Sequence, residues 1–316
     1  MSDTMRAVTL HDFGNADALK LETVPKPVPR DGEVLVRIRA AGINPIDFKT
    51  RDGVGINRRW DGEFPFPVIL GWDISGEVVE SRSPDYTPGD EIYTMARFPL
   101  IGGAYAEFAT VPAEQIAPKP ASISHAEAAA VPLAALTSWQ AMFDTAGLQA
   151  GQRVLVHAAA GGVGHLAVQI AKAKGAWVAG TASARNEDFV RGLGVDQFVD
   201  YGAGDFTGAV DPVDMVFHTI DAEFRPKSWQ VVKPGGWLVS ITGPVTPDEA
   251  KSHNGKGTMI LVTPNAAQLR DIGQLIDDGK VKITLDGVYP LDKTADAHRH
   301  VEGGHTRGKV VIDIDG

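Results

Sequence analysis

The sequence predicts an α/β protein of two domains, with a β-rich first part and a second part in which strands and helices alternate. A length of 316 residues suits two domains, and 43% hydrophobic with 22% charged residues is typical of globular chains. Thirteen of the twenty prolines lie at or before Pro132. Just after Pro120 the pattern changes from short strand-like runs between turns to Ala-rich segments with helical spacing, and we place the domain boundary there.

The first part contains short apolar or alternating runs. Glu33–Ala40 and Ile74–Glu80 are two of them, and turn signals such as Arg30–Gly32 and Tyr86–Asp90 separate such runs. Many short strands between Gly- and Pro-containing turns predict an all-β, barrel-like unit.

The second part alternates between helical and strand patterns. Ser124–Thr145 is Ala-rich with helical spacing, and Val154–Val156 is a short buried strand. After it we expect helix His165–Lys174, strand Trp177–Thr181, helix Asn186–Leu193, strand Gln197–Val199, strand Met215–His218, a helix near Phe224–Val232, strand Trp237–Thr242, strand Met259–Val262, helix Ala266–Asp278, a strand near Val288–Tyr289 and strand Lys309–Ile314. This order predicts βαβ units and a parallel sheet covered on both faces. Periodicity leaves open whether the final strands rejoin the first domain.

Composition excludes several classes of function. The net charge of −10 disfavours a broad nucleic-acid or anionic-membrane footprint. The absence of cysteine excludes disulfides, thiol nucleophiles, Cys-ligated zinc and iron–sulfur clusters. Met1–Arg6 has no apolar core of a secretory signal, and Pro, Gly or His interrupts the most apolar stretches. We therefore expect a cytoplasmic protein with no nucleic-acid or membrane partner.

The most informative segment is the glycine loop. A buried strand runs into Ala159–Gly164, with Ala159 at the first position of a G-x-G-x-x-G spacing, and a helix follows at once. This context predicts a dinucleotide site rather than a ligand-free turn, because glycines let the backbone approach a pyrophosphate and a helix N-terminus attracts its charge. The predicted contacts are Ala160, Gly161, Gly162, Val163 and Gly164.

The end of the second strand indicates which nicotinamide cofactor binds. An NAD site usually places an acid there for the ribose 2′-hydroxyl, but Gly180–Arg185 contains none. Ser183 and Arg185 can instead hold a 2′-phosphate, so we predict NADP(H). The alternative for Arg185 is a solvated residue at a helix start. Tyr201 either closes over the adenosine phosphate or caps the sheet.

Several segments in order along the chain resemble one known superfamily. They are Ala40–Asp47, Pro67–Glu80, Gly103–Val111, Ala128–Gln140, Val154–Ala171 and Arg307–Val311. The chain resembles the medium-chain dehydrogenase/reductase superfamily, in its zinc-free quinone oxidoreductase (zeta-crystallin-like) branch. The resemblance implies a GroES-like β-barrel catalytic domain at residues 1–121, completed by 285–316, and a Rossmann NADP-binding domain at 122–284. It also implies a homodimer, with Met259–Val262 as a candidate edge strand.

The chain departs from the zinc-dependent branch at the metal ligands. Asn44 stands where that branch has its first Cys, and Gly71-Trp72-Asp73 replaces its Gly-His-Glu. Catalytic zinc needs about three protein ligands, and neither Asn44 nor Trp72 can serve, so we expect no metal. The histidines offer no replacement. His298 and His300 face different directions on a helix, and His157 and His165 beside the glycine loop favour packing or capping roles.

The resemblance also implies the catalytic residues. Asn44 is expected beside the nicotinamide, where its amide can bond the carboxamide or the substrate oxygen. Asp47 is expected to orient Asn44 or a proton-delivering water, with a helix-capping role as the alternative. Thr137 is expected at the nicotinamide, with an ordinary helix Thr as the alternative. No Tyr or His is required as a general acid, so we assume protonation by solvent.

Together these features predict an NADPH-dependent quinone oxidoreductase that transfers a hydride to a quinone or similar electron-poor acceptor. An enone, enoyl or 2-alkenal reductase is the same-chemistry alternative, and a non-catalytic NADPH-binding redox sensor or structural protein is the alternative from another class. Trp60, Phe64, Phe66 and Phe98 are candidates for the walls of the acceptor slot and equally for the barrel core. Arg51, Arg58 and Arg59 form either a basic entrance or a solvated loop.

Overall fold

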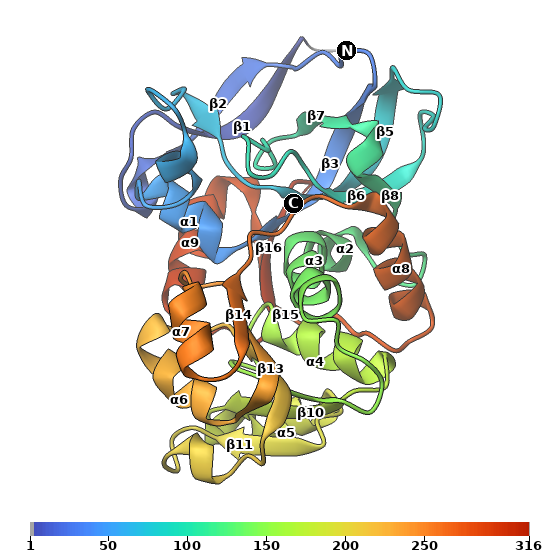
Figure 1. Ribbon diagram of the computed structural model, residues 1–316. Helices are drawn as coiled ribbons and strands as arrows, with labels where there is room; N and C mark the ends of the chain where they lie inside the picture. The colour runs from blue at the N-terminus through green and yellow to red at the C-terminus, as the bar shows by residue number, and fades with distance from the viewer. Residues whose placement is uncertain (1–2, 316) are drawn as a thin grey trace. The chain divides into compact units, whose positions relative to one another are not determined.

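The computed structural model describes residues 3–315, which divide into two compact units (Figure 1). Unit 1 comprises the chain up to Leu136, Thr263–Asp277 and the segment from Ile283 onward. Unit 2 comprises Thr137–Val262 and Asp278–Lys282. The segment from Ile283 onward therefore lies in the same unit as the N-terminal part. This unit also includes residues 122–136 and Thr263–Asp277, which the predicted bounds gave to the Rossmann domain.

Unit 1 is built mainly from antiparallel strands. Its strands are β1 (Thr4–Leu10), β2 (Leu19–Pro25), β3 (Glu33–Ile43), β4 (Val68–Ile69), β5 (Asp73–Ser81), β6 (Glu91–Met95), β7 (Phe108–Pro112), β8 (Ile116–Pro118), β15 (Leu285–Pro290) and β16 (Lys309–Asp313). One sheet has the order β15-β16-β3-β5-β6-β8, with β7 also paired to β3, and the other has the order β2-β1-β4. The terminal strand β16 pairs antiparallel with β3, with Val311 opposite Gly42.

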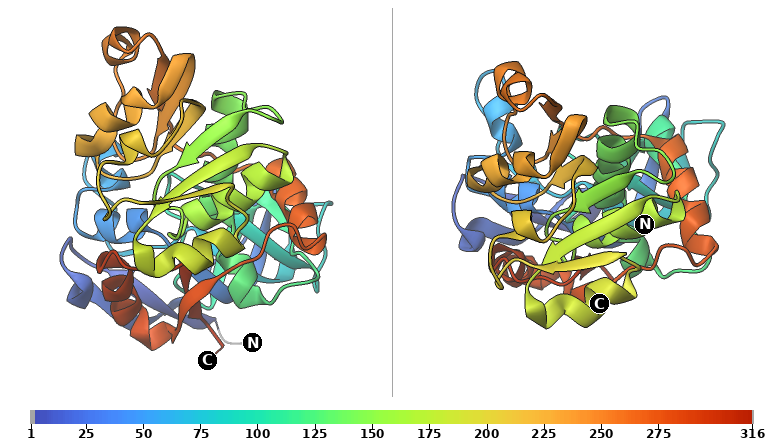
Figure 2. Two further views of the ribbon diagram at one scale, coloured as in Figure 1. Left: turned by 90° about the horizontal axis from the view of Figure 1, so that it is seen from below. Right: turned by 60° about the horizontal axis from the view of Figure 1, so that its bottom comes forward.

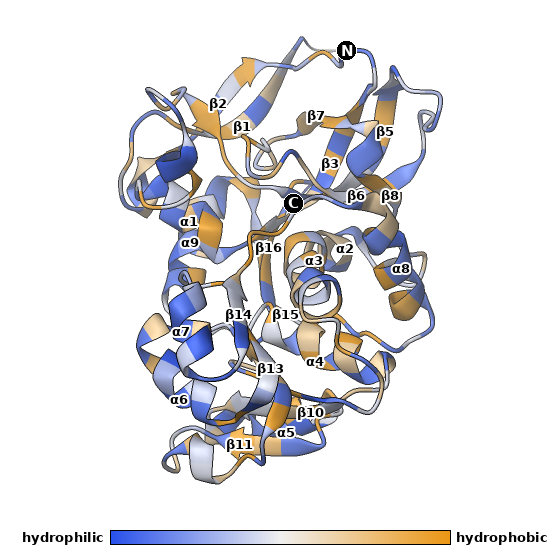
Figure 3. Cartoon of the chain, viewed as in Figure 1, coloured by the Kyte–Doolittle hydropathy of each residue, from blue (hydrophilic) through white to orange (hydrophobic). Residues whose placement is uncertain are grey.

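Helices complete unit 1. They are α1 (Pro45–Arg51), α2 (His125–Ala129), α8 (Ala266–Asp277), α9 (Thr294–Glu302) and the first part of α3 (Pro132–Trp139). Hydrophobic and hydrophilic residues alternate along part of β3 (Figure 3), and its Val34, Val36 and Ile38 are completely buried in the barrel core. This is the period-2 pattern expected of a strand with one face on the core.

Unit 2 is a parallel sheet with helices on both faces. Its strands are β9 (Arg153–Val156), β10 (Trp177–Ala182), β11 (Gln197–Asp200), β12 (Val213–His218), β13 (Val232–Ser240) and β14 (Lys256–Met259), in the order β11-β10-β9-β12-β13-β14. The helices are α4 (Gly164–Ala173), α5 (Glu187–Gly192), α6 (Arg225–Gln230) and α7 (Pro247–Ser252). Helices α4 and α5 pack along β9, β10 and β11, and helices α6 and α7 pack along β12, β13 and β14 (Figure 2). The predicted fold class is confirmed.

One predicted strand is displaced. The apolar run Met259–Val262 favoured a strand there, but β14 occupies Lys256–Met259. The reason is the length of its neighbour: β13 ends at Ser240, which pairs with Met259, so the ladder has no partner backbone beyond that point. The edge position predicted for this strand is correct, because β14 is the last strand of the sheet order.

Gly42 is required by the packing of a helix on unit 1. A Cβ atom at this position would lie 2.2 Å from the backbone oxygen of Ala129 and 2.9 Å from the Cβ of Asp73. Helix α2 therefore approaches β3 at a distance that leaves no room for a side chain.

We predict that Gly42→Ala destabilises the fold by about 1–3 kcal/mol, because backbone must move to admit the methyl group. Gly192→Ala is the matched control, since a Cβ there meets no atom within 4 Å. Urea unfolding followed by circular dichroism measures both variants. An unfolding midpoint for Gly42→Ala equal to that of the wild type contradicts the prediction.

Candidate active site

The glycine loop joins the end of β9 to the start of α4 in unit 2. It begins at Ala158, which has a left-handed φ of 48°. The Ala159 N–H donates to the backbone oxygen of Thr181 at 2.8 Å, and the Gly161 N–H donates to that of Ala158 at 2.9 Å. A Cβ at Gly164 would lie 2.1 Å from the Ala158 oxygen. Gly164 thus lets α4 begin directly above the strand end.

The loop leaves backbone available to a ligand. Gly161, Gly162 and Val163 are partly exposed, whereas Ala160 and Gly164 are buried. The first N–H groups of a helix have no partner within that helix, and the helix dipole makes this end positive. The residues present therefore fit a pyrophosphate, as the glycine pattern predicts.

The strand ends next to this loop bring together the residues predicted for the 2′-phosphate. Ala182 of β10 pairs with Asp200 of β11, and the Tyr201 N–H donates to the Ala182 oxygen at 3.3 Å. Ser183 and Tyr201 therefore follow two neighbouring strands at the same sheet edge. Arg185 lies two residues beyond Ser183 and is exposed, and Tyr201 is 59% exposed.

Asn44 lies at the centre of a buried polar network in unit 1. It links the end of β3 to α1 and is 2% exposed. Its Nδ2 donates to Asp73 Oδ2 at 2.8 Å, and its Oδ1 accepts from Lys309 Nζ at 2.6 Å. Lys309 also donates to the Ile43 backbone oxygen at 2.6 Å. The amide thus bridges a buried ammonium and a buried carboxylate, and the two partners fix its orientation.

Asp73 and Asp47 are the carboxylates of this network, and both are fully buried. Asp73 Oδ1 accepts the Leu133 N–H at 2.8 Å, and Asp47 Oδ2 accepts the Asn44 N–H. Burial raises the pKa of Asp47 to about 8, against the lowering effect of the Asn44 N–H. Burial also raises the pKa of Asp73 to about 6, against the attraction of Lys309. Burial lowers the pKa of Lys309.

Asp47 combines the two roles that the sequence left open. It is the third residue of α1, and it accepts the N–H of the residue that caps this helix. It is therefore a capping residue and also the group that holds the Asn44 backbone in place. Its Oδ1 has no hydrogen-bond partner among residues 3–315, although the Tyr105 hydroxyl lies close enough for the pKa of each group to respond to the other.

A second set of buried residues continues from Asp47. His298 Nε2 lies 3.2 Å from Tyr105 Oη, and Arg51 Nη1 lies 3.2 Å from His298 Nδ1. Because arginine only donates, His298 Nδ1 must accept, and Nε2 must carry the proton that is donated to Tyr105. Arg51 also pairs with Glu302 at 2.6 Å.

The basic-entrance expectation needs correction at Arg51, and the aromatic candidates Phe64, Phe66 and Phe98 fit the barrel-core alternative. Arg51 is 1% exposed and held inside unit 1, so it cannot belong to a surface cluster with Arg58 and Arg59, which are exposed. Phe64 and Phe66 pack against the barrel core, and Phe98 packs edge-on against Trp72 at 5.3 Å.

The remaining predicted residues are positioned as follows. Thr137 lies in α3 and is 5% exposed. His165 Nδ1 donates to the Gly161 oxygen at 3.0 Å, which is the expected capping role, and His157 packs under the glycine loop. His300 bonds Asp286 at 2.8 Å, on a different side from the buried His298.

Sequence reasoning gave no role to Asp73, Lys309, Tyr105 or His298 in this network. The available signal was a charged residue at the first position of a strand, directly before an apolar residue, as in Asp73 of β5 and Lys309 of β16.

The donor set at Asn44 does not fit a zinc ion. Trp72 is fully buried, and its indole N–H donates to the Leu100 oxygen at 2.6 Å, so it offers no ligand atom. Across the part of the chain that the structure describes, no three His, Asp or Glu side chains gather in a metal-binding arrangement. The same residues contain no helix long and apolar enough to cross a bilayer.

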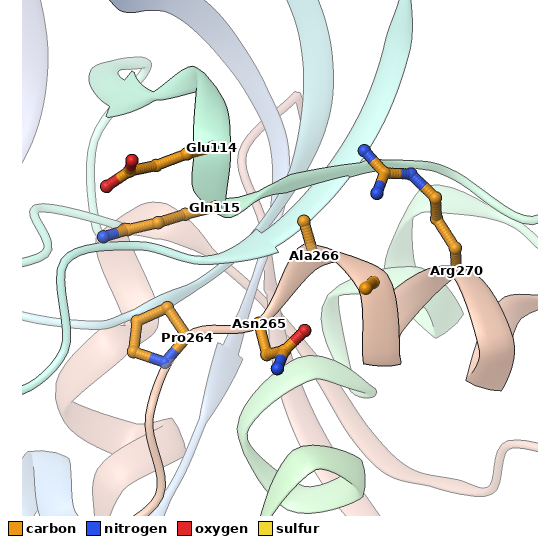
Figure 4. A pocket seen from close by; sticks show the side chains of 7 residues that line it. Glu114, Gln115, Pro264, Asn265, Ala266 and Arg270 are labelled. Atoms are coloured by element: carbon orange, nitrogen blue, oxygen red, sulfur yellow. The ribbon is translucent and has the colours of Figure 1, made fainter.

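A surface pocket of about 440 Å³ lies beside the start of α8 (Figure 4). It is lined by Glu114, Gln115, Pro264, Asn265, Ala266, Ala267 and Arg270. Glu114 and Arg270 are exposed, and Asn265 Oδ1 accepts the Gln268 N–H at 3.0 Å as a helix cap. These groups are explained by the helix start, and we assign no ligand to the pocket.

Comparison with known proteins agrees with this geometry. The alcohol dehydrogenase GroES-like domain matches residues 30–121, and the zinc-binding dehydrogenase family matches residues 193–312. The NADPH-dependent alkenal/one oxidoreductase of Arabidopsis thaliana, named as chloroplastic, is 36% identical over 98% of this chain and 79% of its own length.

Two further relatives are named for quinones. The chloroplastic quinone-oxidoreductase homolog of Spinacia oleracea is 34% identical, with 98% of each chain covered. The solved structure of a quinone oxidoreductase from Coxiella burnetii has a TM-score of 0.91 and 35% identity, covering 98% of this chain and 99% of that one. The chain therefore belongs to the medium-chain dehydrogenase/reductase superfamily, in its quinone oxidoreductase-like branch.

Proposed function

We propose that this protein is an NADPH-dependent quinone oxidoreductase that works without zinc. The observation that carries the proposal is the glycine loop, whose Gly164 lets a helix N-terminus sit at the end of β9, with Ser183, Arg185 and Tyr201 at the adjoining strand ends. The reaction adds a hydride and a proton to a quinone and yields a hydroquinone and NADP⁺. NADPH supplies the hydride when bound, and the protein supplies positioning and a site that excludes water.

We assign the following roles to the residues of the chain. Ala160, Gly161, Gly162, Val163 and Gly164 hold the pyrophosphate, Ser183 and Arg185 hold the 2′-phosphate, Tyr201 covers it, and Thr137 and Asn44 serve the nicotinamide and acceptor. The orientation of Asn44 supports its role, because Lys309 and Asp73 each occupy one side of the amide and leave one N–H and one lone pair for other partners. Asp47 keeps the Asn44 backbone in position.

An enone or 2-alkenal reductase is the second candidate. The support for it is the Arabidopsis thaliana relative named for alkenals and enones, which is as similar to this chain as the relatives named for quinones. Both acceptors are electron-poor and accept a hydride without a metal. A non-catalytic NADPH sensor is the candidate from another class, and it predicts cofactor binding without turnover of either acceptor.

We also propose that the protein is a homodimer in the cytoplasm. The exposed position of β14 at the end of the unit 2 sheet order supports pairing between two copies. The location rests on the sequence alone, and the relatives from Spinacia oleracea and Arabidopsis thaliana are named as chloroplastic.

We expect rapid NADPH oxidation with a simple 1,4-quinone, and NADH slower by about tenfold or more, because only NADPH carries the phosphate that Arg185 can bind. Steady-state absorbance at 340 nm measures both. Turnover with an alkenal but not with the quinone supports the second candidate. Binding of NADPH without turnover of either acceptor supports the sensor.

We expect Arg185→Ala to weaken NADP⁺ binding by about ten- to a hundredfold and to leave NAD⁺ binding nearly unchanged, because a charge-assisted bond to the 2′-phosphate is lost. Isothermal titration with both cofactors measures this. Arg191→Ala is the matched control, since Arg191 is an exposed arginine of α5 that pairs with Glu187 at 2.7 Å. Equal losses for both cofactors rule out the phosphate role.

We expect Asn44→Ala to reduce kcat with the quinone by at least about tenfold and to leave NADP⁺ affinity within a factor of about three, because the phosphate-binding residues lie in unit 2. The same change removes one hydrogen bond from Lys309 and one from Asp73, while the Ile43 oxygen and the Leu133 N–H remain as partners, so a loss of about 1–3 kcal/mol in the free energy of unfolding is expected. Asn57→Ala is the control in the same unit. An Asn44→Ala protein with wild-type turnover excludes the assignment.

A further inference from the structure

Beneath the glycine loop, unit 2 contains a chain of hydrogen-bonded side chains that the proposed reaction does not use directly. His157 follows β9, and its Nδ1 lies 3.1 Å from Thr181 Oγ1 while its Nε2 lies 3.0 Å from Ser228 Oγ. His218 at the end of β12 places Nδ1 3.1 Å from the same Ser228 Oγ. Thr181, His157, Ser228 and His218 are each at most 2% exposed.

The direction of every bond in this chain follows from one carbonyl. His218 Nε2 lies 3.3 Å from the Asp221 backbone oxygen, which only accepts, so Nε2 carries the proton and Nδ1 accepts. Ser228 must then donate to His218 Nδ1, although the Phe224 oxygen lies 3.3 Å away as a second acceptor. His157 therefore donates from Nε2 to Ser228 and accepts at Nδ1 from Thr181. Only this arrangement satisfies all four ring nitrogens.

The far end of the chain holds the first residues of the glycine loop. Thr181 Oγ1 accepts the Ala158 N–H at 3.3 Å, and the Thr181 backbone oxygen accepts the Ala159 N–H at 2.8 Å. Thr219 Oγ1 donates to the His157 oxygen at 2.6 Å. These bonds fix Ala158 in a left-handed conformation that alanine disfavours, and this conformation directs the chain into the loop.

We propose that His157, Ser228 and His218 are positioning residues for the cofactor, which hold the glycine loop in the conformation that binds the pyrophosphate. They touch neither cofactor nor substrate, and they act through Thr181 and the Ala158 and Ala159 backbone. The inference rests on the proposed cofactor site. The proposal adds to that site a network of buried side chains that links the ends of β10, β9 and β12 to helix α6.

The hydrogen-bonded series Thr181–His157–Ser228–His218 requires both imidazoles to be neutral, since a protonated ring cannot accept from Thr181 or Ser228. Burial, together with a smaller effect of the neighbouring His218, lowers the pKa of His157 to about 3. Burial lowers the pKa of His218 to about 4, with the Asp221 carbonyl opposing this change and Arg225 adding to it.

The charges around His218 come from the loop after β12 and from two helices. Asp221 and Glu249 raise its pKa, and Arg225 lowers it. The ring of Phe206 contacts His157 edge-on with centroids 5.0 Å apart and adds no charge. Around neutral pH both rings are therefore in the form that the chain needs.

The central test is Ser228→Ala, which removes the bond between the two rings. We expect NADP⁺ affinity by isothermal titration to fall about tenfold, with kcat at saturating NADPH retained, because the chemistry is not touched. Ser240→Ala is the matched control, since Ser240 is an equally buried serine of β13 outside the chain. Wild-type affinity in Ser228→Ala overturns the proposal.

A pair of His218 variants keeps the test valid where Ser228→Ala fails to fold. His218→Asn retains an acceptor near the Nδ1 position, so we expect NADP⁺ affinity close to the wild type, whereas His218→Leu loses the acceptor and is expected to match Ser228→Ala. Equal weakening in both variants indicates a packing role alone and overturns the proposal.

Long-range ¹⁵N–¹H spectra of the histidine rings give a readout that does not depend on activity. Both His157 and His218 are expected as Nε2–H tautomers at pH 7, and Ser228→Ala is expected to shift both sets of ring resonances. An Nδ1–H tautomer at either residue contradicts the hydrogen-bond directions assigned above and overturns the proposal. A wild type that binds neither NADP⁺ nor NAD⁺ removes the proposed cofactor site together with this inference. A wild type that binds, beside variants that bind equally well, removes only the inference.

Discussion

The buried ammonium of Lys309 is the constraint on which the centre of unit 1 depends. Removing such a charge from water costs on the order of several kcal/mol unless partners replace its hydration. The Ile43 oxygen and the Asn44 amide are those partners, each at 2.6 Å. Because Lys309 opens the last strand and Ile43 closes β3, the same bonds tie the C-terminal segment to the first half of the chain.

This constraint also explains why Asn44 is an asparagine. The position must accept from an ammonium and donate to the Asp73 carboxylate at 2.8 Å, and an amide does both with one planar group. An aspartate here would add a third carboxylate next to Asp47 and Asp73, and an alanine would remove one hydrogen bond from each charged partner. Asp73 in turn accepts the Leu133 N–H, so the network reaches the start of α3. The residue proposed for the chemistry is thus held by the charges that complete the barrel.

The parts of the fold that sequence predicts well are those encoded by neighbouring residues. The period-2 run of β3 and the glycine loop between β9 and α4 depend on local spacing, and both lie where they were predicted. The bonds between Arg51 and His298 and between Asn44 and Lys309 join residues 247 and 265 positions apart. No periodicity encodes which distant charge completes a buried site. For that reason the sequence suggested that Arg51 belongs to a basic surface cluster, although the residue is buried. The strand predicted at Met259–Val262 is likewise found at Lys256–Met259, where β13 provides a pairing partner.

The buried carboxyl groups and the buried histidines respond to pH in opposite directions. Asp47 and Asp73 keep protons in the folded state up to a pKa of about 8 and about 6, whereas the unfolded chain loses them near 3.8, so the stability that they contribute falls as pH rises through this range. His157, His218 and His298 stay neutral in the folded state down to a pKa of about 3 or 4, whereas the unfolded chain takes up protons near 6.5, so their contribution falls as pH decreases. His157 and His218 are neutral above about pH 4 and Asp73 is a carboxylate above about pH 6, so the groups that orient the glycine loop and Asn44 have the charge states described above at neutral pH.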